Sequence, residues 1–323
     1  MKTVRLGIIG TNFVSDWLCD GVKKCDGIIN HAVYSRREET GRAFADKHGI
    51  QTVYTDMEAF LSSDIDAVYI ASPNICHYAQ AEAAMRHGKH VLVEKPATLT
   101  KDEFISLEEI ARENGVVILE AMRPAHDPAI HDAISHLSDI GTIRRAVFEF
   151  CQYSSRYDKF KAGEILNAFN PQMGNAAVMD IGVYPLHVCA MFFGQPNSIR
   201  AKSTVLHNGF EGMGSVILDY GEIEAEVVYS KIADSVNPSA VLGEDGAITI
   251  GKLSMGENVR LIPRNGEIKE ISGVRGTDNM VYEIADFVRI INGETTADYW
   301  NKLTEITLGI IDEIRKQNGI SFE

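Results

Sequence analysis

The chain has 323 residues, more than a single hydrophobic core usually serves, so we expect two domains. Its composition, with 45% hydrophobic and 24% charged residues, is that of a globular protein and excludes a disordered chain. The formal net charge of -14, with no cluster of Lys and Arg, argues against nucleic acid or an anionic membrane surface as a partner.

The five cysteines are scattered along the chain and show no CxxC or Cys/His pairing. Their odd number and their spacing indicate neither a disulfide framework nor a zinc site, so we expect no metal and a reducing, cytoplasmic location. The apolar start of the chain stops at Thr11, which is too short for a signal peptide or for the roughly 20 residues that span a bilayer. We expect no membrane segment elsewhere.

Short apolar runs alternate with helical stretches over the first 120 residues. The runs that predict strands are 4–9, 29–34, 66–71, 90–93 and 116–119. Between them, apolar residues recur at helical spacing, as they do from Phe13 to Val22. This alternation predicts an α/β domain over residues 1–121, a doubly wound parallel sheet of the Rossmann type with helices on both faces.

The pattern changes after about residue 122. Longer alternating strands are predicted at 144–153, 214–220, 222–230 and 247–251, with helices near 176–193, 278–292 and 300–317. Residues 122–323 are therefore expected to form an α+β domain on a mainly antiparallel open sheet, with a cleft between the two domains. One face of this sheet would pack against helices and the other would meet a second subunit in a homodimer, unless that face is solvated.

A glycine loop follows the first predicted strand. Gly7 and Gly10 stand at its end, and the helix that begins near Asn12 would aim backbone N–H groups, with Thr11 and Phe13 beside them, at the pyrophosphate of a dinucleotide. Asn12 replaces the second glycine of the GxGxxG signature, and its ability to adopt left-handed backbone angles would preserve the turn. The alternative is a strand-to-helix turn that binds no nucleotide.

The second predicted strand is followed by Ser35, Arg36 and Arg37, with no acid where NAD-specific proteins bind the ribose 2′-hydroxyl. Ser35 can donate a hydrogen bond to a 2′-phosphate, and either arginine can pair with it through the guanidinium group. The sequence therefore favours NADP over NAD as cofactor. The alternative is a pair of solvated arginines at the start of a surface helix.

Three later segments are more specific. They are IASPNICHYAQAEAAMRHGKHVLVEKP at 70–96, EAMRPAHDP at 120–128 and MGNAAVMDIGVYPLH at 173–187. Together they resemble the glucose–fructose oxidoreductase, inositol dehydrogenase and rhizopine-catabolism (Gfo/Idh/MocA) family over almost the whole chain, in the branch with a DxGxY motif. The resemblance implies a soluble oxidoreductase that moves a hydride between a nicotinamide cofactor and a hydroxyl or carbonyl group of a sugar, polyol or diol.

The resemblance also implies roles for particular residues near the cofactor. These are Ser72, Pro73, Asn74 and His77 along its nicotinamide side, Glu94 and Lys95 in the next turn, and Arg123 as a brace. A lysine beside the reacting oxygen stabilises developing alkoxide charge and lowers the pKa of a neighbouring phenol. The alternatives are a helix-terminal histidine without a ligand for His77, a surface lysine for Lys95 and a structural salt bridge for Arg123.

Asp180 and Tyr184 are four residues apart and His187 lies three further along, so all three are expected on one helix face. We predict that Tyr184 is the acid/base, supported by Lys95, and that Asp180 binds a substrate hydroxyl and orients its catalytic neighbours, as the resemblance implies. The alternative for Tyr184 is an aromatic side chain that only packs against the helix, next to Pro185. His187 stands where the family often has an acid, and a core histidine is its favoured interpretation. Tyr157 and Asn170 would contact a polyol or lie in a solvated loop.

Two functions of other classes stay open on the same fold. One is a non-catalytic nucleotide sensor that signals through a protein partner, and the retained Lys95, Asp180 and Tyr184 argue against it. The other is a glycoside hydrolase that uses tightly held NAD for transient oxidation. Ser35, Arg36 and Arg37, which favour NADP, argue against the hydrolase, because such an enzyme needs no exchangeable NADP.

Overall fold

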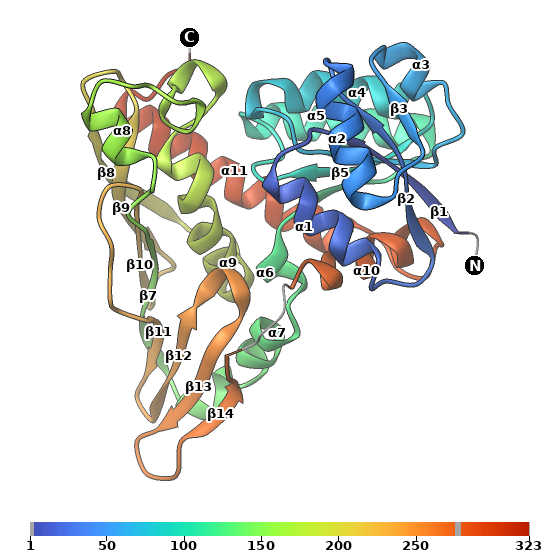
Figure 1. The fold of residues 1–323 in the computed structure, drawn as a ribbon. Coiled ribbons are helices and arrows are strands. Elements are labelled where there is room, and N and C mark those ends of the chain that lie inside the picture. The colour runs from blue at the N-terminus through green and yellow to red at the C-terminus, as the bar shows by residue number, and fades with distance from the viewer. Residues whose placement is uncertain (1–2, 275–278, 323) are drawn as a thin grey trace. The chain divides into compact units, whose positions relative to one another are not determined.

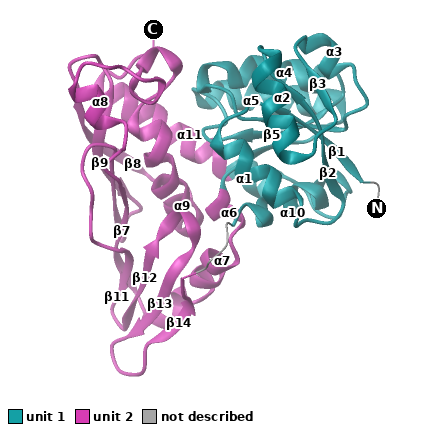
Figure 2. Ribbon diagram, in the orientation of Figure 1, with its two compact units in different colours: residues 1–122, 278–302 teal, residues 123–277, 303–323 magenta. Residues whose placement is uncertain are grey.

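The computed structural model describes residues 3–274 and 279–322. It forms two compact units, Met1–Met122 with Asp278–Lys302, and Arg123–Thr277 with Leu303–Glu323 (Figure 2). The sequence predicted a single domain boundary, between residues 121 and 122, whereas in the structure α10 (Met280–Ile291) belongs to the first unit. It does so because it packs against α1 (Phe13–Val22), where a Cβ atom on Gly21 would lie 2.8 Å from Cδ1 of Ile284.

The first unit is built on a six-stranded sheet in the order β3-β2-β1-β4-β5-β6, and every pair of neighbours is parallel (Figure 1). The strands are β1 Val4–Ile9, β2 Ile28–Tyr34, β3 Thr52–Tyr54, β4 Ala67–Ile70, β5 His90–Glu94 and β6 Ile118–Ala121. Besides α1 and α10, the helices are α2 Glu38–His48, α3 Met57–Leu61, α4 His77–Arg86 and α5 Lys101–Asn114. The predicted Rossmann topology is confirmed, and ligands bind such sheets at the carboxyl ends of the strands.

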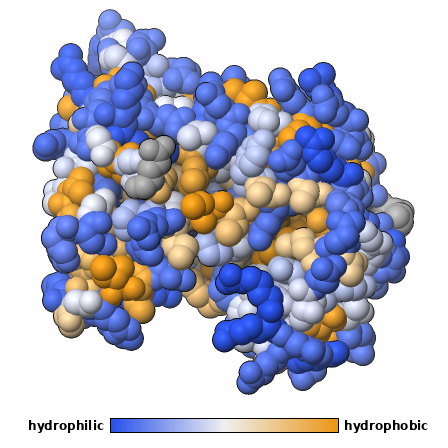
Figure 3. Space-filling view, turned by 90° about the horizontal axis from the view of Figure 1, so that it is seen from above, coloured by the Kyte–Doolittle hydropathy of each residue, from blue (hydrophilic) through white to orange (hydrophobic). Residues whose placement is uncertain are grey.

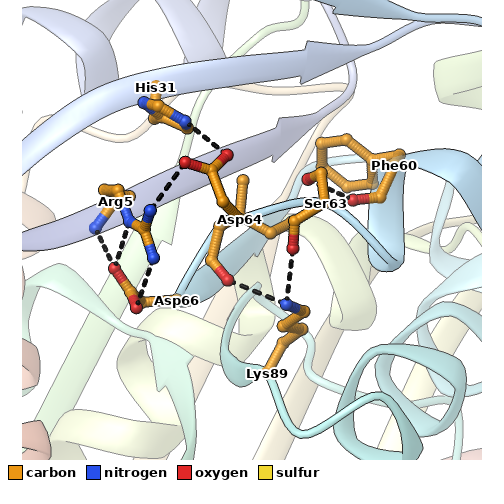
Figure 4. Close-up of polar contacts among 8 residues, drawn as sticks. Arg5, His31, Phe60, Ser63, Asp64, Asp66 and Lys89 are labelled. Atoms are coloured by element: carbon orange, nitrogen blue, oxygen red, sulfur yellow. Dashed lines mark hydrogen bonds and ion pairs between the residues drawn. The ribbon is translucent and has the colours of Figure 1, made fainter.

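Charged side chains tie the amino ends of these strands together (Figure 4). Arg5 on β1 donates from Nε to Oδ2 of Asp66 at 2.9 Å and from Nη1 to Oδ2 of Asp64 at 2.6 Å. His31 Nε2 lies 2.9 Å from Oδ1 of Asp64, and Lys89 donates to two carbonyl oxygens of the same loop. This network anchors the loop before β4 at the edge opposite to the one that binds ligands.

The second unit is built on an eight-stranded sheet in the order β14-β13-β12-β11-β7-β10-β9-β8. Its neighbours are antiparallel except for β7 and β10, so the mainly antiparallel α+β prediction is confirmed. The strands are β7 Ile143–Cys151, β8 Ser198–Val205, β9 Glu211–Asp219, β10 Glu224–Ser230, β11 Ser239–Gly243, β12 Gly246–Lys252, β13 Glu257–Pro263 and β14 Lys269–Ser272. The main helices are α6 Arg123–His126, α7 Pro128–Ser135, α8 Tyr157–Lys161, α9 Val183–Phe193 and α11 Asp298–Asn318.

One face of this second sheet is buried, because alternate residues of its central strands point toward α9. Phe148, Val216, Leu218 and Val227 are at most 1% exposed.

Among the described residues, Pro171–Phe193 is the one helical segment long and apolar enough to cross a bilayer, and 89% of its apolar window is buried inside the structure, as in a core helix. The face drawn in Figure 3 is mostly hydrophilic, with hydrophobic residues in separate groups.

Candidate functional site

The loop between β1 and α1 is shaped by a glycine and an asparagine. Gly10 has a φ of +102°, and a Cβ atom there would lie 2.5 Å from the carbonyl oxygen of Ala71, so only glycine fits. Asn12 caps α1, since its Oδ1 accepts from the N–H groups of Val14 at 2.9 Å and Ser15 at 3.3 Å, and its Nδ2 donates to Ala71 O at 2.7 Å. Its backbone is extended, with a φ of -91°, so the expected left-handed conformation is wrong. The side chain, through these three hydrogen bonds, shapes the turn.

The other residues predicted in this loop differ in their surroundings. Gly7 lies within β1, where a Cβ atom would lie 2.6 Å from the Phe60 ring, so this glycine leaves space for a core side chain. Phe13 is 50% exposed and packs edge-on against Trp17, with ring centroids 5.0 Å apart. Thr11 is half-buried beside the cap. Gly7 therefore acts on packing, whereas Thr11 and Phe13 are accessible.

Two exposed guanidinium groups lie at the carboxyl end of β2, those of Arg36 and Arg37. Ser35 is half-buried between them and the strand, and its Oγ donates to the carbonyl oxygen of Arg37 at 2.9 Å. The Ser35 hydroxyl also lies 2.8 Å from that of Thr40 on α2. Sequence reasoning missed Thr40, which adds a second hydroxyl to this corner.

His77 connects two loops at the carboxyl edge of the sheet. Ser72, Pro73 and Asn74 form the first loop, directly after β4. The imidazole is 1% exposed, with Nδ1 2.9 Å from the carbonyl oxygen of Pro96 and Nε2 2.9 Å from that of Ser72. Burial lowers the pKa of His77, and the charge of Lys95 acts in the same direction, whereas the hydrogen bonds to the two carbonyl oxygens act in the opposite direction. His77 is thus a buried link between the loop after β4 and the turn that carries Lys95.

The turn around Lys95 is fixed by buried partners on both sides. Before it, Glu94 accepts a short hydrogen bond from the hydroxyl group of Tyr69. After it, the N–H of Ala97 donates to Oε1 of Glu120 at 2.8 Å, and Glu120 is 3% exposed on β6. Lys95 itself is half-buried. Sequence reasoning missed Glu120, whose partner lies 23 positions away in the chain.

The DxGxY segment lies in the second unit and is not a regular α-helix. Val178–Gly182 forms a π-turn that runs directly into α9. Pro185, in the first turn of α9, has no N–H to donate to the preceding turn, and the backbone is widened just before it. Single π-turns often occur at functional sites, and this one carries Asp180.

Asp180 has a partner that the sequence did not indicate. Lys231, directly after β10, donates from Nζ to Oδ2 of Asp180 in a short ion pair and to the carbonyl oxygen of Ala168 at 3.1 Å. The two charged residues are 51 positions apart, so no local motif connects them. The structure thus places a cation on the carboxylate predicted to bind substrate.

Glu211 holds the start of the same segment. It is fully buried and accepts hydrogen bonds from the N–H of Val178 at 2.8 Å, the Ser203 hydroxyl at 2.9 Å and the Tyr229 hydroxyl at 2.7 Å. Burial raises the pKa of Glu211, while these hydrogen bonds act in the opposite direction. The Tyr229 ring leaves no room at Gly182, where a Cβ atom would lie 2.9 Å from it, which accounts for the glycine of the DxGxY motif.

Tyr184 and His187 both lie on α9 and are both buried. Tyr184 is 7% exposed, and its ring lies 5.6 Å from that of Phe150. His187 is 1% exposed, with Nδ1 3.2 Å from the Thr307 hydroxyl. Burial lowers the pKa of His187 to about 3, so the ring is neutral at pH 7. These surroundings are those of a core histidine.

The remaining predicted residues have structural partners in the second unit. The Tyr157 ring stacks on that of Phe169, with centroids 5.6 Å apart. Asn170 caps a short turn by accepting from the backbone two residues ahead at 3.1 Å. Arg123 donates from Nη1 to the sulfur of Met255 at 3.5 Å. Of the predicted catalytic residues, Lys95 belongs to the first unit, and Asp180 and Tyr184 belong to the second.

Comparison with known proteins gives consistent matches over the whole chain. Residues 4–122 match a model described as the oxidoreductase family with an NAD-binding Rossmann fold, and 135–249 match the GFO/IDH/MocA C-terminal domain. The scyllo-inositol 2-dehydrogenase (NADP(+)) IolU of Bacillus subtilis is 39% identical, covering 99% of this chain and 98% of its own. The uncharacterized oxidoreductase YgjR of Escherichia coli is 35% identical over the same shares. Among solved structures, KijD10, a 3-ketoreductase from Actinomadura kijaniata in complex with NADP and TDP-benzene, has a TM-score of 0.85, 22% identity and 98% coverage of both chains.

Proposed function

Because this chain belongs to the Gfo/Idh/MocA family of NAD(P)-dependent oxidoreductases, we propose that it is an NADP-dependent dehydrogenase of sugar-like alcohols. The hydride would move between the nicotinamide and a CH–OH or carbonyl carbon of a sugar, polyol or diol. A relative named for scyllo-inositol and NADP, aligned from end to end, supports this substrate class. A solved structure of a ketoreductase with NADP has the same fold.

The observation that carries the proposal is the carboxyl edge of the six-stranded sheet. There the Gly10 turn and the Asn12-capped start of α1 follow β1. The neighbouring strand β4 is followed by the loop that His77 connects to the turn carrying Lys95. A dinucleotide needs a close backbone approach and a helix N-terminus for its pyrophosphate, and both are present. Gly10 lacks a Cβ atom, which would meet the carbonyl oxygen of Ala71, so the turn packs closely against the loop that follows β4.

The choice of NADP over NAD rests on the end of β2. Arg36 and Arg37 are exposed there, and Ser35 with Thr40 adds two hydroxyl groups. A guanidinium group pairs with a phosphate through two parallel hydrogen bonds, whereas a 2′-hydroxyl group offers no charge to pair. The end of β2 therefore favours the phosphorylated ribose.

Each residue of the site would have a separate task. When bound, the nicotinamide supplies or accepts the hydride. The Tyr184 hydroxyl would take the proton of the substrate hydroxyl during oxidation and return it during reduction. The Lys95 ammonium would stabilise negative charge on the substrate oxygen, and the Asp180 carboxylate would accept a hydrogen bond from a substrate hydroxyl.

The state of the cysteines bears on the cellular compartment of the enzyme. All five cysteines are free thiols, and those of Cys19, Cys151 and Cys189 have pKa values raised by burial to about 12. Such thiols are inert and serve as small apolar side chains. We therefore place the enzyme in a reducing cytoplasm.

Calorimetric titration with NADPH and with NADH tests the cofactor site. Arg36→Ala is expected to weaken NADPH binding by about tenfold to a hundredfold, because it removes a charge-assisted contact, and to leave NADH binding unchanged. Arg42→Ala is the matched control, since Arg42 is exposed on α2, which begins two residues after Arg36, and pairs with Glu38 at 3.5 Å. Absence of binding to either nucleotide, or a preference of the wild type for NADH, would overturn the proposal.

A further inference from the structure

The ammonium group of Lys231 is almost completely enclosed. The side chain is 5% exposed, and Nζ donates to the carbonyl oxygen of Ala168 at 3.1 Å and to Oδ2 of Asp180. Two aromatic rings complete its surroundings, since Nζ lies 5.2 Å from the ring centroid of Phe169 and 5.6 Å from that of Phe210. Aromatic faces stabilise a cation but do not neutralise it, so Asp180 is its counter-ion.

The two members of the pair differ in accessibility. The Asp180 side chain is 38% exposed, whereas that of Lys231 is 5% exposed. The carboxylate is therefore the member that another molecule can reach, and the ammonium holds it from the protein side. A cation on one carboxylate oxygen favours the ionised form and restricts the rotation of the group.

We infer that Lys231 is a positioning residue, which keeps Asp180 ionised and oriented as the acceptor for a substrate hydroxyl. The inference rests on the proposed function and assigns separate tasks within it: Asp180 binds the hydroxyl, and proton transfer is left to Tyr184.

Lys231→Met removes the charge and keeps the length of the side chain. With scyllo-inositol and D-xylose as substrates and NADP as cofactor, KM is expected to rise about tenfold to a hundredfold, while kcat changes much less, because an interaction made in the ground state is weakened. Lys231→Arg retains the cation and is expected to restore most of the loss. NADPH affinity, measured separately by titration, should not change in either variant.

If Lys231 had only a structural role, Lys231→Met would lower the stability of the protein without raising KM. Lys89→Met is the matched control, since Lys89 also donates from Nζ to two backbone carbonyl oxygens, at 2.9 Å each, at the edge of the first sheet opposite to the cofactor end. Urea unfolding of Lys231→Met, Asp180→Asn and the double variant should show that the double variant loses less stability than the sum, because Asp180→Asn alone leaves a buried charge unpaired. If Lys231→Met does not fold, the test is made with Lys231→Arg and the double variant.

The outcomes distinguish a positioning role of Lys231 from the dehydrogenase activity itself. A KM that rises in Lys231→Met, recovers in Lys231→Arg and stays normal in Lys89→Met supports the inference. Wild-type turnover with a KM that is the same in Lys231→Met and Lys89→Met overturns the inference and leaves the proposed function intact. A wild-type protein that binds neither NADPH nor NADH overturns the proposed function, and the inference with it.

Discussion

The neutral His187 has a defined tautomer. The hydroxyl group of Thr307 donates its single hydrogen to the carbonyl oxygen of Leu303 at 2.8 Å, so in its 3.2 Å contact with Nδ1 of His187 the imidazole is the donor. Burial lowers the pKa of His187 to about 3, and the charge of His126 acts in the same direction. A proton on this ring is therefore strongly disfavoured in the folded state.

Stability should consequently depend on pH through His187. Below about pH 6.5 the unfolded chain binds a proton at this residue, whereas the folded chain does not until about pH 3, so stability is lost as the pH falls through that window. At pH 4.5 the loss from this residue alone is about 2 to 3 kcal/mol. His187→Asn, which keeps a donor and cannot be charged, should flatten the difference in urea unfolding between pH 7 and pH 4.5.

The control is a histidine whose shift has the opposite sign. The hydrogen bond to Glu58 raises the pKa of His87, so its contribution is present at low pH and is lost as the pH rises through the folded pKa. His87→Asn should therefore make the acid loss steeper. An unchanged pH dependence in His187→Asn would contradict the assignment of a neutral buried ring.

At the scale of elements, the π-turn before α9 is held from two sides. Glu211 accepts from the N–H of Val178 at its start, and the Tyr229 ring packs on Gly182 at its end. Gly182 has an ordinary helical φ of -63°, so glycine is required there for space and not for backbone freedom. The turn that carries Asp180 is thus positioned by residues of β9 and β10.

Gly182→Ala tests this packing. The new Cβ atom would lie 2.9 Å from the Tyr229 ring, and such overpacking costs about 1 to 3 kcal/mol, against a gain of about 1 kcal/mol in helix propensity. We expect a net loss of stability in urea unfolding and a loss of turnover, because Asp180 and Tyr184 must shift. In a Tyr229→Leu background the same substitution should cost less. An equal cost in both backgrounds would show that the ring is not the obstacle.

The sequence predicted those elements that local patterns encode. The strand at Val4–Ile9 is apolar except for Arg5 and was predicted, whereas β8, β11, β13 and β14 were not. In β8, SIRAKSTV, every second residue is exposed and polar, so the strand exists through its pairing with β9 and not through an apolar run of its own. A short strand such as β3, with three residues, carries too little pattern to be found.

The residues of the candidate site were likewise found from the sequence only where a local motif contains them. Asp180, Tyr184 and Lys95 stand in recognisable motifs and were selected from the sequence. Lys231 and Glu211 were missed, because the contacts that give them a role join residues 51 and 33 positions apart. Asn12 was selected for the wrong reason, since its side-chain hydrogen bonds, and not its backbone angles, form the turn.

At the scale of the whole molecule, the outward face of the eight-stranded sheet combines apolar and charged residues. Val147 on β7, Glu226 on β10 and Ile217 on β9 pair side by side, and Ile217 is 39% exposed. The next row of partners runs from Glu149 on β7 to Lys202 on β8. On this face β8 carries Arg200 and Lys202, β10 carries Glu224 and Glu226, and β7 carries both Arg145 and Glu149.

This distribution suits a twofold-symmetric pairing of two copies. In an isologous interface the same patch meets itself in reverse, so the basic strand β8 of one copy would face the acidic strand β10 of the other, with the apolar residues between them. We therefore expect a homodimer that sediments at about twice the 35.6 kDa mass of one chain. Ile217→Glu would bury an additional charge in the interface, next to Arg200 and Glu226, and should shift the protein toward the monomer. Ile29→Glu, at a position 46% exposed on the six-stranded sheet, is the control and should sediment as the wild type does. A wild-type protein that remains a monomer at micromolar concentration would show that this sheet face is solvated, because an interface of this kind would then already have formed.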